Sequence, residues 1–103
     1  MKSGEIRLYK FKAPYKKRPI LILTRDSILE YLGEVTVAPI TATVRDIPSE
    51  VFLSKQDGMA KDCAINLDHI QTVSKGKIGS LITTLSTDKL ERVTEAIQFA
   101  LNL

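Results

Sequence analysis

Acidic residues are nearly absent from the first twenty-five positions of this chain, where Glu5 is the only one. Eight of the fifteen Lys and Arg residues lie in the same segment, which carries a net charge of +7, while the remaining residues carry −4. A basic segment on a compact chain indicates a polyanionic partner, and nucleic acid is the first candidate because phosphate neutralisation dominates such affinities. A lysine-rich, solvated loop would produce the same charge pattern without any such partner.

Cysteine and histidine are equally scarce, with one of each, Cys63 and His69. A lone cysteine cannot form an intramolecular disulfide, and we expect Cys63 to be a buried, inert thiol rather than a catalytic one. One Cys and one His cannot assemble a zinc site of Cys and His ligands within one chain. Carboxylate-bound magnesium is harder to exclude, but no close pair of acids has a suitable spacing. We therefore expect no metal ion and no cofactor.

Long apolar runs are missing as well. No stretch of eighteen apolar residues occurs, so no transmembrane helix is indicated. The N-terminus alternates polar and apolar residues and lacks the apolar segment of a signal peptide, which predicts a cytoplasmic protein with no membrane partner. Internal repeats, low-complexity segments and linkers are also lacking, and a length of 103 residues fits a single domain, 1–103.

What is present is a series of short strand patterns followed by one helical pattern. Strands are expected over residues 4–11, 19–24, 34–40, 49–53, 63–67 and 78–85. Residues 12–18 indicate a hairpin loop, and 26–33 are ambiguous, with one helical turn possible. From Thr87 onward, with Ser86 as N-cap, an apolar face recurs at helical spacing: Leu90, Val93, Ile97, Ala100 and Leu101. The expected fold is mainly β (α+β), a small, partly open barrel or strongly curved sheet with a C-terminal helix.

Two strand ends carry side chains that suit phosphate binding. Arg18 precedes Pro19 at the start of an apolar strand, where its planar guanidinium can hold two phosphate oxygens. The alternative is one more exposed charge in a basic loop. Thr41 and Thr43 follow another buried strand, and their hydroxyls can donate to a phosphate or simply satisfy nearby backbone groups.

The only histidine, His69, lies beside the carboxylate of Asp68 and is a natural acid or base near neutral pH. Adjacent residues of a strand point to opposite faces, so the two should form a pair only if the backbone kinks. A lone surface or half-buried histidine is the alternative.

Taken together, five segments stand in the order and approximate spacing of the MazF/PemK toxins, and the chain resembles that family over nearly its whole length. The segments are Gly4–Ile6, Arg18–Leu23, Val37–Thr41, Asp62–Asp68, and Ile78–Ser86 leading into the terminal helix. The resemblance implies an SH3-like, partly open antiparallel β-barrel with a C-terminal α-helix, and a homodimer. It also implies a metal-independent endoribonuclease that cleaves single-stranded RNA, and a cognate antitoxin whose acidic segment occupies the RNA groove.

The family's two principal catalytic residues, the arginine before the proline and the threonine after Pro-Ile, correspond to Arg18 and Thr41. Asp68 matches an acidic position that is catalytic in some members and contacts substrate in others. Two departures stand out: residues 12–17 are short and basic with no acid, and Asn66 stands where some members have an arginine.

This reading predicts attack of the RNA 2′-hydroxyl on the adjacent phosphate, giving 2′,3′-cyclic phosphate and 5′-hydroxyl ends and thereby inhibiting translation and growth. Asp68 or His69 would act as a base or contact a nucleobase. The expected RNA contacts are Tyr15 by stacking, Lys16, Lys17 and Arg25 at phosphates, and Thr43 and Asn66. The target class (mRNA, tRNA or rRNA) is open. The competing classes are a non-catalytic nucleic-acid-binding barrel and a module whose basic loop contacts an acidic protein.

Overall fold

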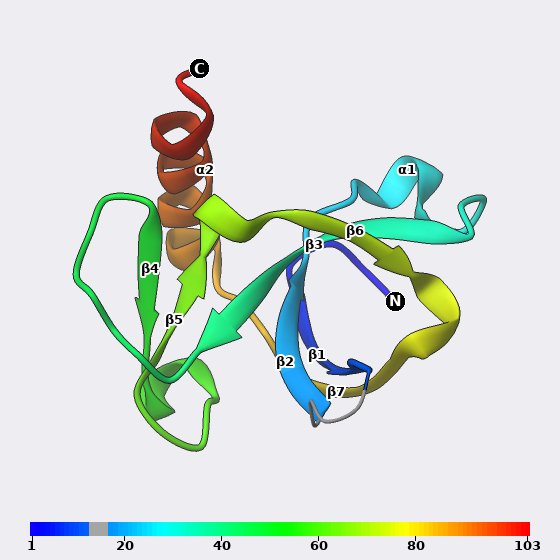
Figure 1. Cartoon of the computed structure of the whole chain (residues 1–103), viewed down its shortest axis with the longest axis horizontal. Helices are drawn as coiled ribbons and strands as arrows, with labels where there is room; N and C mark the ends of the chain where they lie inside the picture. The colour runs from blue at the N-terminus through cyan, green and yellow to red at the C-terminus, as the bar shows by residue number, and fades with distance from the viewer. Residues whose placement is uncertain (13–16) are drawn as a thin grey trace.

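A computed structural model describes residues 1–12 and 17–103, and within them a curled antiparallel sheet is accompanied by two helices (Figure 1). The strands are β1 (Glu5–Lys10), β2 (Lys17–Ile22), β3 (Glu34–Thr41), β4 (Glu50–Leu53), β5 (Cys63–Asn66), β6 (Gln71–Ser74) and β7 (Ile78–Thr84), and the helices are α1 (Asp26–Leu29) and α2 (Thr87–Leu101). The predicted mainly β fold, a partly open antiparallel barrel with a C-terminal helix, is confirmed. No helix among the described residues is long and apolar enough to cross a membrane.

The long strand β3 is the centre of the architecture, because it pairs with three other strands. Its first half, Glu34–Val37, pairs with β6, and its middle, Val37–Pro39, pairs with β2. Its last two residues, Ile40 and Thr41, pair with Ile65 and Ala64 of β5. The strand order β4-β5-β3-β2-β1-β7 follows, with β6 attached to β3 beside this path. Figure 1 shows β3 running across the molecule from the side of α1 and β6 to the side of β4 and β5.

The alternation of side chains along β2 and β3 builds a core on each face of the sheet. Leu21 of β2 and Ala38 of β3 belong to the larger core, which α2 also joins. Ile20 and Ile22 point the other way and pack with Val37 in a second core that includes the single buried residue of α1, Leu29. Both faces of the central strands are therefore apolar, which is why residues 19–24 show a continuous apolar run.

Helix α2 begins where the sequence predicted, since the Ser86 hydroxyl accepts a hydrogen bond from the Lys89 backbone N–H at 3.3 Å. Its buried residues are Val93 and Ala96. Of the residues on the predicted apolar face, Leu101 is 55% exposed, because the end of α2 projects away from the sheet (Figure 1).

The structure differs from the sequence-based expectation at three local elements. Strand β5 ends at Asn66 rather than at Leu67, because the Asn66 side chain accepts a bond from the Asp68 N–H at 3.0 Å and starts a 3-10 turn over Leu67–His69. Strand β6 was not predicted, since only one of its four residues, Val73, is buried and the pattern is too weak to indicate a strand. The helical turn after β2 is shorter than expected and ends at Leu29.

Candidate active site

The candidate site lies where β2 and β3 part from each other. The pairing of these strands includes Ile20 with Pro39, and in the same register Arg18 would stand across from Thr41. The pairing is seen only from Ile20 onward, and the residue before it, Pro19, has no N–H to donate to a neighbouring strand. The sequence predicts Pro19 as the first residue of its strand, but β2 begins at Lys17 and Pro19 is its third residue. The two strands therefore open at this end instead of closing the sheet.

A cavity of about 300 Å³ occupies this opening, and both Arg18 and Thr41 line it. Lys61 is the third side chain with a strong hydrogen-bonding group in its lining. The remaining lining residues are mostly apolar: Pro19, Ile40, Ala42, Met59, Ala60, Cys63 and Ile82. Apolar walls around a few polar groups are typical of a ligand-binding cavity, and they strengthen the electrostatic effect of the charges present.

Thr41, the last residue of β3, is half-buried, and its hydroxyl oxygen accepts a hydrogen bond from the Thr43 N–H at 3.1 Å. A hydroxyl has one proton to donate and two lone pairs to accept. Because the bond from Thr43 uses a lone pair, the Thr41 proton is left to donate to a ligand in the cavity. The local backbone bond that the sequence offered as an alternative is thus present and compatible with ligand binding.

Arg18 is exposed, and the three ion pairs found among the described residues belong to other cations, namely Arg7, Arg45 and Lys89. Lys17 precedes it on β2, opposite Lys10 of β1. Arg18 is therefore an exposed lining residue of the cavity, beside further positive charge, and it can meet an anion without first giving up an ion-pair partner among the described residues.

Cys63 is nearly buried at the cavity and fits the predicted inert thiol. Burial raises the pKa of its thiol, and the nearby carboxylates of Asp62 and Asp57 raise it further, whereas Lys61 acts in the opposite direction. The thiol is therefore protonated at neutral pH and is a poor nucleophile.

Asp68 and His69 lie at the other end of β5 from the residues that face the cavity. Both are exposed in the 3-10 turn after that strand, and this turn packs against α2. The Asp68 carboxylate accepts a hydrogen bond from the Ser49 hydroxyl at 2.5 Å. Neither residue lines the cavity of Arg18 and Thr41. The structure therefore brings the first two candidates together and leaves this pair elsewhere on the chain.

The expected RNA contacts are spread over several places. Lys17 is exposed next to Arg18, and Thr43 is exposed two residues beyond Thr41. Arg25 is exposed at the opposite end of β2, where it precedes α1. Asn66 is buried, and its side-chain oxygen is occupied by the turn at Asp68. Tyr15 and Lys16 lie outside the described residues. All six assignments of RNA contacts stay predictions.

Sequence reasoning missed Lys61, which reaches the cavity from the segment before β5. A single lysine next to an aspartate in a turn is typical of a solvated loop, so no sequence signal distinguished it. Within the described residues, no group of three or more His, Cys, Asp or Glu side chains could hold a metal ion.

Comparisons with known proteins agree on one family. Residues 2–101 match the family described as PemK-like, MazF-like toxin of type II toxin-antitoxin system. Endoribonuclease MazF3 of Mycobacterium tuberculosis is 38% identical over 88 residues, which cover 85% of this chain and 85% of that protein. The solved structure of the Mycobacterium tuberculosis toxin MazF-mt6 has a TM-score of 0.88 and 34% identity, and the match covers 96% of this chain and 97% of that one. An endoribonuclease in complex with its cognate antitoxin, from a mycobacterial species, also has a TM-score of 0.88, covering 100% of this chain and 96% of that one; at 22% identity it supports the fold alone.

Proposed function

Because the chain belongs to the family of PemK-like, MazF-like toxins of type II toxin–antitoxin systems, we propose that it is the toxin endoribonuclease of such a system, formed by a single domain. Its substrate is single-stranded RNA, which is cut in the cavity between β2 and β3. The observation that supports this proposal is that Arg18 and Thr41, from two different strands, line the same apolar-walled cavity.

The cleavage uses the substrate's own nucleophile. The 2′-hydroxyl oxygen attacks the adjacent phosphorus and gives up its proton, and the bond from phosphorus to the 5′-oxygen breaks. That oxygen takes up a proton and leaves as a 5′-hydroxyl, while the other fragment keeps a 2′,3′-cyclic phosphate. Charge builds up on the non-bridging oxygens in the transition state, and positioned hydrogen-bond donors stabilise it without requiring a metal ion or a cofactor.

Arg18 and Thr41 supply those donors. The planar guanidinium of Arg18 donates to the non-bridging oxygens. The Thr41 hydroxyl donates its free proton to the same phosphate and holds the phosphorus in line with the attacking 2′-oxygen. Asp68 and His69 do not line this cavity, so we assign them to contacts with RNA away from the reacting phosphate. Lys17 and Thr43 flank the cavity and contact the neighbouring nucleotides.

Family membership also defines the partners of the protein. A cognate antitoxin inhibits it by placing an acidic segment over the basic end of β2, where it competes with RNA. The toxin acts in the cytoplasm on mRNA, tRNA or rRNA, and cleavage of these molecules stops translation and growth.

The cleavage products test the proposed chemistry. Purified protein incubated with single-stranded RNA in excess EDTA should give defined fragments. Their 5′ ends should accept phosphate from a polynucleotide kinase, and their 3′ ends should resist ligation until the cyclic phosphate is removed. Intact RNA with a salt-dependent gel shift would instead indicate a non-catalytic binding barrel. Fragments that appear only when magnesium is added would contradict the metal-independent chemistry.

We further propose that the protein is a homodimer that uses the C-terminal end of α2. Phe99, Leu101 and Leu103 are exposed there, and a group of large exposed apolar side chains at one end of a molecule marks an interaction surface. Light scattering at micromolar concentration should give the mass of two chains, and Phe99→Glu should shift it toward one. Gln98→Glu adds the same charge at a neighbouring polar position and should leave the dimer intact. A single-chain mass for the parental protein would contradict the proposal.

A further inference from the structure

The cavity contains a second cation that the proposed mechanism has not used. Lys61 lies in the short segment between a 3-10 turn over Lys55–Asp57 and the first residue of β5, Cys63. Lys61 lines the same cavity as Arg18 and Thr41, and it is exposed. Three separate parts of the chain thus bring one hydrogen-bonding side chain each to one opening.

The charges of this cavity are not balanced by acids. Among the described residues that line it, the ionisable groups besides the protonated Cys63 thiol are Arg18 and Lys61, and both are cations. Arg7, Arg45 and Lys89 make the ion pairs seen in the described part of the chain, so neither cavity cation is engaged in one. Two cations beside apolar walls repel each other, and an anion bound between them removes that repulsion. The arrangement therefore fits a phosphate group.

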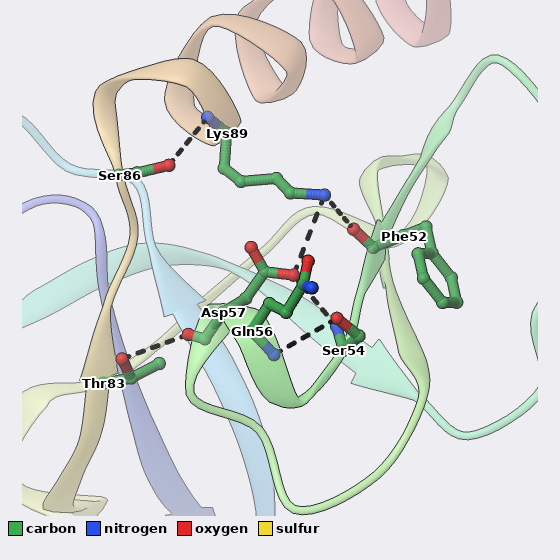
Figure 2. Close-up of polar contacts among 7 residues, drawn as sticks. All are labelled: Phe52, Ser54, Gln56, Asp57, Thr83, Ser86 and Lys89. Carbon is green, nitrogen blue, oxygen red and sulfur yellow. Dashed lines mark hydrogen bonds and ion pairs between the residues drawn. The ribbon is translucent and has the colours of Figure 1, made fainter.

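The 3-10 turn that precedes Lys61 is anchored by polar contacts to two other elements (Figure 2). The Asp57 carboxylate accepts a bond from the Ser54 N–H at 2.9 Å and lies 3.7 Å from the Lys89 ammonium of α2. The Asp57 carbonyl oxygen accepts a bond from the Thr83 hydroxyl of β7 at 3.2 Å. Figure 2 shows these three partners arranged around Asp57, so the turn is tied to both α2 and β7.

The backbone after this turn directs the next residues toward the cavity. Gly58 adopts a left-handed conformation with φ of 97°, and the next residue, Met59, is buried in the larger core. Because Asp57 and Met59 are both held, the flexible part of the segment is short. The backbone of Lys61 is thereby kept at the edge of the cavity, which lowers the entropy lost when its side chain binds a ligand.

We propose that Lys61 binds a phosphate of the RNA in this cavity, as a third contact beside Arg18 and Thr41. This assignment rests on the proposed function, since it names a residue that holds the same substrate. An ammonium acts as a compact point charge with three donors, so the contact requires the charge rather than a planar fork. Lys61→Arg should then preserve RNA binding. Arg18→Lys, in contrast, removes a planar fork and should weaken the contact with phosphate.

The salt dependence of RNA binding tests this proposal separately from cleavage. The probe is a single-stranded RNA methylated at every 2′-oxygen, which keeps the phosphates and lacks the nucleophile. For Lys61→Ala, the slope of log affinity against log salt concentration should become shallower by about 0.7, the value for one phosphate contact on a single strand. Affinity at low salt should fall about tenfold, in line with a charge-assisted hydrogen bond. Lys61→Arg should behave like the parental protein.

Lys77→Ala is the matched control, because Lys77 is an exposed lysine that does not line the cavity. It should leave both slope and affinity unchanged. A Lys61→Ala slope equal to that of the parental protein would overturn the proposal, whatever happens to the cleavage rate. If the parental protein binds the probe but does not cut unmodified RNA, the proposed nuclease fails, while the slope still decides the role of Lys61. If it does not bind the probe at low salt, both proposals fail.

Discussion

Replacing Arg18 by alanine is expected to lower the rate of RNA cleavage by about 10²- to 10³-fold, the usual effect of removing one donor aimed at transition-state charge. The fold should be unaffected, because the side chain is exposed and belongs to neither core. Initial rates on a defined RNA give the first quantity, and thermal unfolding gives the second. Surface substitutions of this kind change the free energy of unfolding by about 0.5 kcal/mol or less.

Two further variants make the Arg18 result specific. Arg18→Lys keeps the charge but loses the planar fork, so its rate should fall between those of the parental protein and Arg18→Ala. Arg92→Ala removes an exposed arginine of α2 that does not line the cavity, and it should cleave at the parental rate. If Arg18→Ala cleaves as fast as the parental protein, the cavity between β2 and β3 is not the catalytic site.

The largest expected effect on stability comes from Gly58→Ala, which should lower the free energy of unfolding by about 1–3 kcal/mol. Position 58 has φ of 97°, a conformation that residues with a Cβ rarely adopt. An added Cβ would also press against the Oγ1 of Thr83 and lie 2.7 Å from the Thr83 Cβ. Chemical denaturation followed by circular dichroism measures the loss.

Gly33→Ala is the control for this prediction, because nothing lies within 4 Å of the Cβ it would add and Gly33 is not among the residues with positive φ. It should be neutral or stabilise the protein by up to about 1 kcal/mol. Gly58→Ala should also reduce cleavage, since the displaced backbone carries Met59 and Lys61 of the cavity wall. Equal stability of the two variants would mean that the turn before β5 is not constrained as the structure describes.

Much of the local structure could be predicted because its causes are local. The alternation in residues 4–11 gave β1, and the helical spacing after Ser86 gave α2, since side-chain periodicity and capping depend on neighbours in the chain. Strand β6 was not predicted from the sequence, because the cause of its conformation is not local. Its four residues carry little pattern of their own, and they form a strand because β3 offers a partner along its first half.

The sequence by itself determined which side chains could serve the chemistry: a guanidinium before a proline, and a hydroxyl at the end of a buried strand. Only the tertiary structure decided which of them meet. It brings Arg18 and Thr41 to one cavity, adds Lys61 from a distant turn, and leaves Asp68 and His69 at the other end of β5. The physical reason is that strand register and the opening between β2 and β3 arise from pairing between segments far apart in the chain, which local patterns do not encode.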